Sequence, residues 1–268
     1  MKRLCIILAL LLALTGPALA QETEYPDGIY RGFYYDGGIE QIAIQFELQD
    51  GVFQSLLYRG VRYKDGDYMS EDASDYQKAA LRQYRELAAY LVGRGVDAID
   101  DLYDPYGIVE DIDAVTTATM QSSKLISALW DGLNRRPFKL LSTAKLPAAG
   151  DFADGLYRGF YMEDGQEEVA VEFTLKSNVF STLRYRALSY RGQDYLDPGA
   201  GEEVRAVAGQ FGQLLSYLEG KPVDCVNDLY QPGNIASDAD ALSGATIRAP
   251  KVISAIWDAL NRHAYHVE

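Results

Sequence analysis

The chain contains Asp27-Gly28-Ile29-Tyr30-Arg31-Gly32-Phe33-Tyr34 near its start and repeats it 127 positions later as Asp154-Gly155-Leu156-Tyr157-Arg158-Gly159-Phe160-Tyr161. A second pair has the same offset: Leu125-Ile126-Ser127-Ala128-Leu129-Trp130-Asp131-Gly132-Leu133-Asn134-Arg135 and Val252-Ile253-Ser254-Ala255-Ile256-Trp257-Asp258-Ala259-Leu260-Asn261-Arg262. The equal offsets leave no net insertion between the pairs. Such a period exceeds that of solenoids and propellers and has the size of a domain. The sequence therefore predicts two tandem copies of one domain.

The N-terminal segment 1–20 has the pattern of a secretory signal peptide. Lys2 and Arg3 precede an apolar stretch from Leu4 to Leu14, and Ala18-Leu19-Ala20 supplies small residues for cleavage. The apolar stretch is too short to span a bilayer comfortably. We therefore expect cleavage after Ala20 and a periplasmic or otherwise extracytoplasmic protein. An uncleaved N-terminal anchor is the alternative.

The mature chain is strongly acidic. The full sequence has a formal net charge of −14, and loss of the two basic residues of the signal makes it −16. Such a charge repels nucleic acid and anionic membranes. We expect no nucleic-acid partner, and no direct membrane span after signal cleavage, because no other apolar segment is long enough. Proteins with basic surfaces remain suitable partners.

Each copy begins with strand patterns. In the first copy, Gly28 to Tyr35 is rich in Tyr and Phe, 41–48 alternates polar and apolar residues like a half-buried strand, and Val52 to Tyr63 is a further strand. The second copy repeats this order, with strands over 168–175 and 179–190 after its opening stretch. Short turns between the strands predict antiparallel pairing.

Helical patterns follow the strands in each copy. They cover Ala79 to Val92 and Val204 to Leu218, and a last helix covers about Ser123 to Asn134 and about Pro250 to Asn261. Strands followed by helices predict an α+β fold, with an antiparallel sheet packed against helices in each repeat. We expect domain 1 over 21–141, a linker over 142–153 and domain 2 over 154–268.

A run of small and hydroxylated residues precedes the last helix of each copy. It reads Asp240-Ala241-Leu242-Ser243-Gly244-Ala245-Thr246 in the second copy and Asp113-Ala114-Val115-Thr116-Thr117-Ala118-Thr119 in the first. A helix N-terminus favours a phosphate, and Gly244 with Ala245 would allow close approach of the backbone. Lys124 and Lys251 are placed in the first turn, where a cation opposes the helix dipole unless an anion is bound. Simple helix capping by Ser122 or Ser123 is the alternative.

These residues resemble the FMN-binding domain, which carries covalent flavin in subunits of sodium-pumping quinone reductase and Rnf complexes and in exported flavoproteins. The resemblance rests on Ser243-Gly244-Ala245-Thr246 after Asp240, on the Trp-bearing helix and on the opening Asp-Gly-x-Tyr-x-Gly. It implies FMN joined through a phosphoester to Thr246, and to Thr119 in the first copy, by a flavin transferase that uses FAD. Cofactor-binding positions implied with these are Ser243, Gly244, Ala245, Asp240, Thr116 and Asp113.

Both copies depart from the family pattern. Thr117 stands where the motif has Gly, and Arg248-Ala249-Pro250 stands where the family usually has a hydroxylated pair, which the first copy keeps as Ser122 and Ser123. The resemblance implies an exported electron-transfer flavoprotein with one or two covalent FMN groups that relays electrons between redox proteins. A ligand-binding or scaffolding module of the same fold without flavin is the alternative.

Other residue types point away from stand-alone catalysis. The sequence has no Gly-x-Ser-x-Gly elbow, no P-loop and no Cys/His metal set, so we expect an electron carrier rather than an enzyme with its own catalytic residues. His263 and His266, the only histidines, are expected in a frayed tail, without a metal. Cys225, the one thiol outside the signal, has Ala98 as its counterpart and is interpreted as core filler. Six strand tyrosines are interpreted as structural: Tyr30, Tyr58, Tyr63, Tyr157, Tyr185 and Tyr190.

Overall fold

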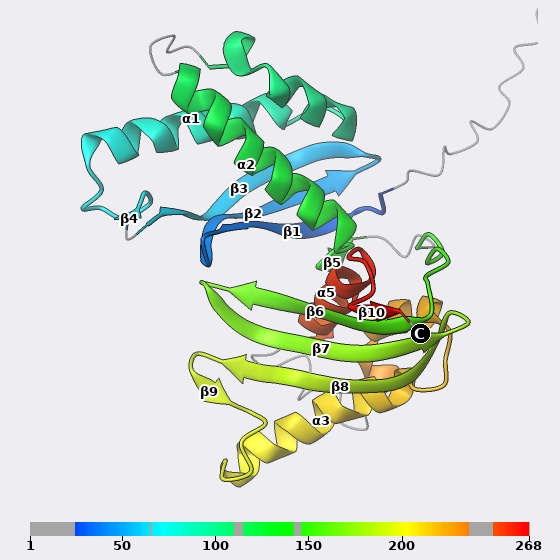
Figure 1. Cartoon of the computed structure of the whole chain (residues 1–268). Coiled ribbons are helices and arrows are strands. Elements are labelled where there is room, and N and C mark those ends of the chain that lie inside the picture. The colour runs from blue at the N-terminus through cyan, green and yellow to red at the C-terminus, as the bar shows by residue number, and fades with distance from the viewer. Residues whose placement is uncertain (1–24, 65, 110–114, 142–145, 236–248, 268) are drawn as a thin grey trace, which may run out of the picture.

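The computed structural model describes residues 25–64, 66–109, 115–141, 146–235 and 249–267, without the side chains of 115–121, 167 and 267. It has an α+β structure with two five-stranded antiparallel sheets, ordered β4-β3-β2-β1-β5 and β10-β6-β7-β8-β9 (Figure 1). We call the part from β1 to β5 the first half and the part from β6 to β10 the second half. Among the described residues, no helix is both long and apolar enough to cross a membrane.

The first half contains the following elements in chain order: β1 (Gly28–Asp36), β2 (Ile39–Gln49), β3 (Val52–Tyr63), β4 (Gly66–Asp67), α1 (Asp75–Leu91), the 3₁₀ helices η1 (Val96–Tyr103) and η2 (Pro105–Gly107), α2 (Val115–Asn134) and β5 (Lys139–Leu140). The second half contains β6 (Gly155–Glu163), β7 (Gln166–Lys176), β8 (Val179–Tyr190), β9 (Gln193–Asp194), α3 (Glu202–Leu218), η4 (Val223–Tyr230), η5 (Pro232–Asn234), α5 (Ala249–Leu260) and β10 (His266–Val267). The main predicted strands, and the helices α1, α3 and α5, are confirmed with small shifts at their ends.

The helix ends follow local chemistry. Ser74 and Gln77 form a reciprocal capping box at the start of α1. Gly93 and Gly220, just beyond the ends of α1 and α3, have φ values of +83° and +77°, which glycine adopts without a side-chain clash. The turn residues that the sequence indicates therefore end these helices.

Each long hairpin packs closely against the Trp-bearing helix of its own half. A Cβ on Gly32 of β1 would lie 1.8 Å from the carbonyl oxygen of Ala128 on α2, and one on Gly159 of β6 would lie 2.2 Å from that of Ala255 on α5. Only glycine permits this separation. The close packing buries the apolar faces of α2 and α5 against β1 and β6.

The two hairpins share one register at the offset of 127. Gly28 pairs with Leu48 in the first half, and Gly155 pairs with Leu175 in the second. A β-bulge follows Tyr34 in β1 and Tyr161 in β6. The repeated sequence thus produces strand pairs with the same irregularity at the same place.

The halves meet where the outer face of the first sheet covers part of the second half. Phe33 and Ala43, on the face of the first sheet away from α2, belong to the same apolar cluster as Tyr161 and Val169 of the second half. The rings of Phe33 and Tyr161 lie 5.5 Å apart, edge to face. Figure 1 shows α1 and α2 on the opposite side of that sheet.

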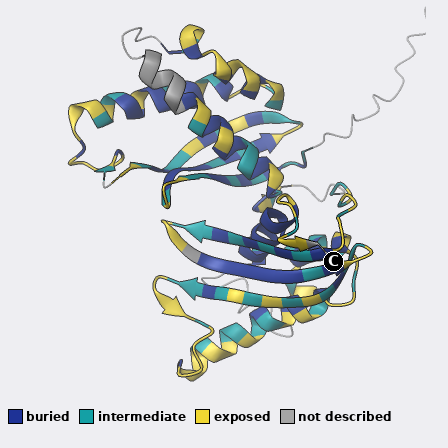
Figure 2. Ribbon diagram, viewed as in Figure 1, coloured by how far each residue is buried: buried dark blue, intermediate teal, exposed yellow. Residues whose placement is uncertain are grey.

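Three expectations are wrong in detail. The helix α2 begins at Val115 rather than near Ser123, because no Gly or Pro interrupts 115–131. The tail does not fray at His266, which pairs with Leu156 and extends the second sheet. The alternating strands are not simply half-buried: Glu168 to Phe173 of β7 is buried throughout, as the dark band in Figure 2 shows.

Candidate functional site

The residues assigned to flavin attachment lie at or beyond the borders of the described structure. The range 236–248 is outside it and contains Asp240, Ser243, Gly244, Ala245 and Thr246, and the range 110–114, also outside, contains Asp113. Thr116 and Thr119 fall within the backbone span of α2, so they do not precede the helix as expected. The described structure next to 236–248 is the first turn of α5.

A buried lysine stands in this first turn. Lys251, the third residue of α5, is only 4% exposed. Its Nζ lies 2.8 Å from Oε2 of Glu163 at the end of β6, and it also donates a short bond to Glu168 on β7. Lys251 opposes the helix dipole, but two carboxylates of the same chain are its counter-ions. Its position at the start of α5 is therefore not by itself evidence of a bound phosphate.

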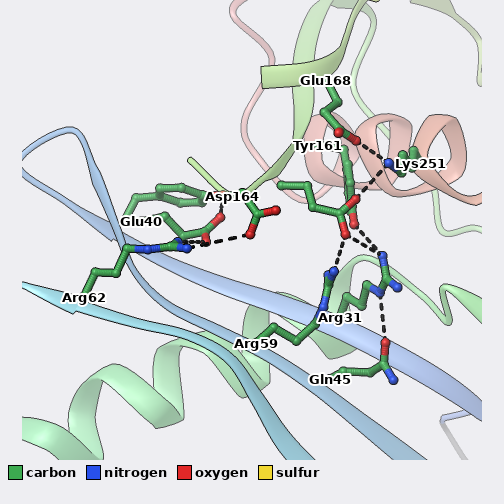
Figure 3. A network of polar contacts seen from close by, with 11 residues as sticks. Arg31, Glu40, Gln45, Arg59, Arg62, Tyr161, Asp164, Glu168 and Lys251 are labelled. Atoms are coloured by element: carbon green, nitrogen blue, oxygen red, sulfur yellow. Dashed lines mark hydrogen bonds and ion pairs between the residues drawn. The ribbon is translucent and has the colours of Figure 1, made fainter. Parts of the chain in front are cut away.

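Glu163 connects this lysine to the first half. Its Oε1 accepts a 3.3 Å hydrogen bond from Nη1 of Arg31 on β1 and a short one from Nη2 of Arg59 on β3. The same Nη1 of Arg31 donates to the hydroxyl of Tyr161 at 2.9 Å. Figure 3 shows Arg31, Arg59, Tyr161 and Lys251 directed toward one another from the two halves.

The electrostatics of this cluster favour the ionised forms of Glu163 and Lys251. Burial alone would raise the pKa of Glu163, but hydrogen bonds from Lys251 and Arg59 outweigh it and lower the pKa to about 2. Burial likewise disfavours the ammonium of Lys251, but Glu163 and Glu168 raise its pKa above the usual value. For Glu168, burial dominates and raises the pKa. Arg31, Arg59 and Lys251 therefore share two carboxylates, Glu163 and Glu168.

A second ion group lies beside the first, at the turn of the β6–β7 hairpin. Arg62 of β3 donates to Glu40 of β2 at 3.0 Å and lies 3.7 Å from Asp164 in the turn (Figure 3). Tyr35 donates its hydroxyl to the other oxygen of Glu40 at 3.1 Å. The arginines Arg31, Arg59 and Arg62 of one sheet thus bind the hairpin of the other.

The Trp-bearing helices also join at their C-terminal ends. Arg135, 3% exposed, binds Asp131 through Nε at 2.8 Å and Asp258 of α5 through Nη2 at 2.7 Å. Asp131 accepts the backbone N–H of Phe33, and Asp258 accepts that of Phe160, both at 2.9 Å. Each aspartate therefore fixes the opening strand of its own half, and Arg135 ties the two together.

The sequence did not reveal these networks. Glu163 lies beside an Asp-Gly turn and gives no signal of its own, and the arginines lie far from it along the chain. Two signals were present: Lys251 opposes the helix dipole, and Glu168 occupies a position that is Gln41 in the first copy. The second copy thus has a carboxylate where the first has a neutral amide, and this carboxylate is the one that pairs with Lys251.

Tyr58, Tyr185 and Cys225 agree with structural roles. The hydroxyl of Tyr58 donates to the carbonyl of Tyr84 at 2.8 Å, and that of Tyr185 donates to the carbonyl of Phe211 at 3.0 Å. Cys225 packs against the second-half core, and burial raises the pKa of its thiol. Within the described ranges, no group of three or more His, Cys, Asp or Glu could hold a metal. Comparisons with protein families, curated proteins and solved structures found no match.

Proposed function

We propose that this protein is an exported electron-transfer flavoprotein with FMN attached to Thr246 through a phosphoester. The observation that carries the proposal is the run Ser243-Gly244-Ala245-Thr246, which ends shortly before α5 begins at Ala249. The FMN-binding domain that this run resembles uses the final Thr for attachment. Bound FMN would supply the redox chemistry, and the chain would supply its position and surroundings.

The start of α5 supports a phosphate nearby. The N-terminus of a helix of this length presents free backbone N–H groups and partial positive charge. In the attachment step, the hydroxyl of Thr246 would displace AMP from FAD, so that FMN is joined to the chain and AMP leaves.

We propose further that the protein consists of two tandem copies of one domain, over 21–141 and 154–268. Matching strand registers and the matching bonds from Asp131 and Asp258 support this division. Two observations speak against flavin at Thr119: this residue lies within the span of α2, and Thr117 replaces the motif glycine. The acidic surface would attract basic redox proteins outside the cytoplasm.

The test is co-expression with a flavin transferase, followed by denaturing electrophoresis and detection of flavin fluorescence on the protein band. We expect fluorescence that Thr246→Ala abolishes or reduces to the share carried by Thr119. Thr119→Ala alone is the matched control, and the double variant gives the background. A colourless wild-type band of unmodified mass would refute flavin attachment.

A binding or scaffolding module without flavin is the second candidate. It is favoured by Lys251, whose charge is already balanced by Glu163 and Glu168. This alternative predicts the same folded structure and the same stability with and without the transferase.

A further inference from the structure

The first half contains a half-buried lysine that forms no ion pair with a carboxylate of the described residues. Lys124 on α2 has its Nζ 5.0 Å from the centre of the Tyr63 ring, and Nζ of Lys64 lies 5.3 Å from the same ring. Neither lysine forms an ion pair with any described residue. We propose that Lys124, with Tyr63 and Lys64 beside it, forms a binding site for the phosphate group of a small molecule.

In the second half, the equivalent lysine is neutralised by carboxylates of the same chain. At the offset of 127, Lys251 corresponds to Lys124, Tyr190 to Tyr63 and Arg191 to Lys64. Lys251 and Arg191 lie 5.3 and 5.1 Å from the Tyr190 ring, so the arrangement of two cations around one tyrosine is repeated. In the second half, however, the ammonium of Lys251 forms ion pairs with Glu163 and Glu168.

In the first half, the described residues contain no equivalent of these two ion pairs at Lys124. Gln41 replaces Glu168, and Asp36 replaces Glu163. The amide of Gln41 donates to the backbone oxygen and to Oδ2 of Asp36 at 3.4 and 3.3 Å, so Asp36 is engaged by Gln41. The buried Oε1 of Gln41 has no hydrogen-bond partner in the described part of the chain, and the neutral amide brings no negative charge to the position that Glu168 holds in the second half.

The charge balance favours an external anion. Burial lowers the pKa of Lys124, and Asp36 offsets this only in part, so the ammonium has lost hydration without gaining a bonded counter-ion. A phosphate would restore both hydrogen bonds and charge, and lysine is a frequent phosphate ligand. The ammonium groups of Lys64 and Lys124 lie no more than about 10 Å apart. The positive charge of Lys64 therefore also attracts a phosphate that hydrogen-bonds to Lys124 alone.

The site can be tested with inorganic phosphate on the full chain, expressed without a flavin transferase, so that the result is independent of flavin attachment. The measurement is the NMR signal of the Lys124 side chain during titration at constant ionic strength, with acetate as a monovalent carboxylate probe. We expect a saturable shift with phosphate, a weaker one with acetate, and at least about a tenfold loss of affinity in Lys124→Gln, followed by the remaining lysine and amide signals. Lys78→Gln, which removes an exposed lysine on α1, should bind phosphate like the wild type.

A second variant separates a built site from general attraction between charges. Gln41→Glu gives Lys124 the carboxylate that Lys251 has, so it should raise the pKa of Lys124 and abolish the phosphate-induced shift. Thermal unfolding checks that each variant is folded, and Lys124→Gln carries the test alone if Gln41→Glu does not fold. Equal binding by wild type and Lys124→Gln, or an equal loss in Lys78→Gln, would overturn the proposal.

Discussion

The guanidinium of Arg135 at the end of α2 donates a 2.7 Å hydrogen bond to Oδ1 of Asp258 on α5. The same side chain binds Asp131 and the carbonyl oxygen of Phe160. Both aspartates hold backbone N–H groups of the opening strands. One buried cation therefore links the two helices and, through them, the two sheets.

Replacement of Arg135 should be costly. Arg135→Met would leave two partly or fully buried aspartates without their shared cation, and we expect the free energy of unfolding to fall by about 3–5 kcal/mol. Arg262, its counterpart at the offset of 127, bonds the same Oδ1 of Asp258 but is 51% exposed in its side chain. Arg262→Met should cost less than about 1 kcal/mol. Urea unfolding of both variants measures this difference, and equal costs would contradict the account of the junction.

The contact of the hairpin with α2 gives a second prediction. Gly32→Ala places a methyl group against the backbone of Ala128, so either β1 or α2 must move. We expect a loss of about 3 kcal/mol or more, in the range of severe overpacking. Gly209→Ala is the control: Gly209 lies in α3 with nothing within 4 Å of an added Cβ, and this variant should gain up to about 1 kcal/mol. Thermal unfolding distinguishes the two, and an unchanged midpoint for Gly32→Ala would show that the contact is loose.

The low pKa of Glu163 makes stability depend on pH. Its folded-state pKa of about 2 lies below that of an unfolded glutamate, so its stabilisation is complete above about pH 5 and is lost as the pH falls toward 2. Between pH 7 and low pH, we expect Glu163→Gln to lose about 1–2 kcal/mol less unfolding free energy than the wild type, a modest difference because the carboxylate is partly exposed. Glu40 and Glu168, whose pKa values burial raises, act in the opposite direction and are present in both proteins. Urea unfolding at pH 7 and pH 3 tests the difference, and parallel losses in the two proteins would be evidence against the ion cluster.

The two corresponding lysines should differ in their effect on stability. Lys251→Met leaves Glu163 and Glu168 facing each other, so we expect a loss of about 2–4 kcal/mol at pH 7 that becomes smaller at low pH as the carboxylates are protonated. Lys124→Met removes a cation that forms no ion pair within the described ranges and should change stability by less than about 1 kcal/mol. A comparable loss for both variants at pH 7 would mean that the halves do not differ here.

The sequence predicted the elements whose signals are local. The alternation in β2 and β7, the glycines after α1 and α3 and the periodicity of α5 all depend on neighbouring residues, and these elements were correctly predicted. The start of α2 was misplaced because Thr-rich segments have weak helix propensity, and only the absence of Gly and Pro indicated continuation. The tail at His266 was missed because its pairing partner, Leu156, lies far away in the sequence.

The candidate site depended still more on distant contacts. Gln41, Glu168 and Glu172 appeared to be the solvent face of alternating strands, but all three are buried. Gln41 bonds Asp36, Glu168 pairs with Lys251, and Glu172 is covered by Arg158 and Arg184. Periodicity identifies the two faces of a strand, but it does not show that a second layer of the protein covers the polar one.

The central claim is the attachment of FMN at Thr246, and mass spectrometry of the purified chain after co-expression with a flavin transferase tests it most directly. We predict an intact mass increased by FMN phosphoester, with fragmentation of the proteolytic peptide placing the modification on Thr246, and its loss from that peptide in Thr246→Ala. An unmodified Thr246 peptide from the wild-type chain, produced beside a transferase that modifies a known substrate in the same cells, would contradict the account.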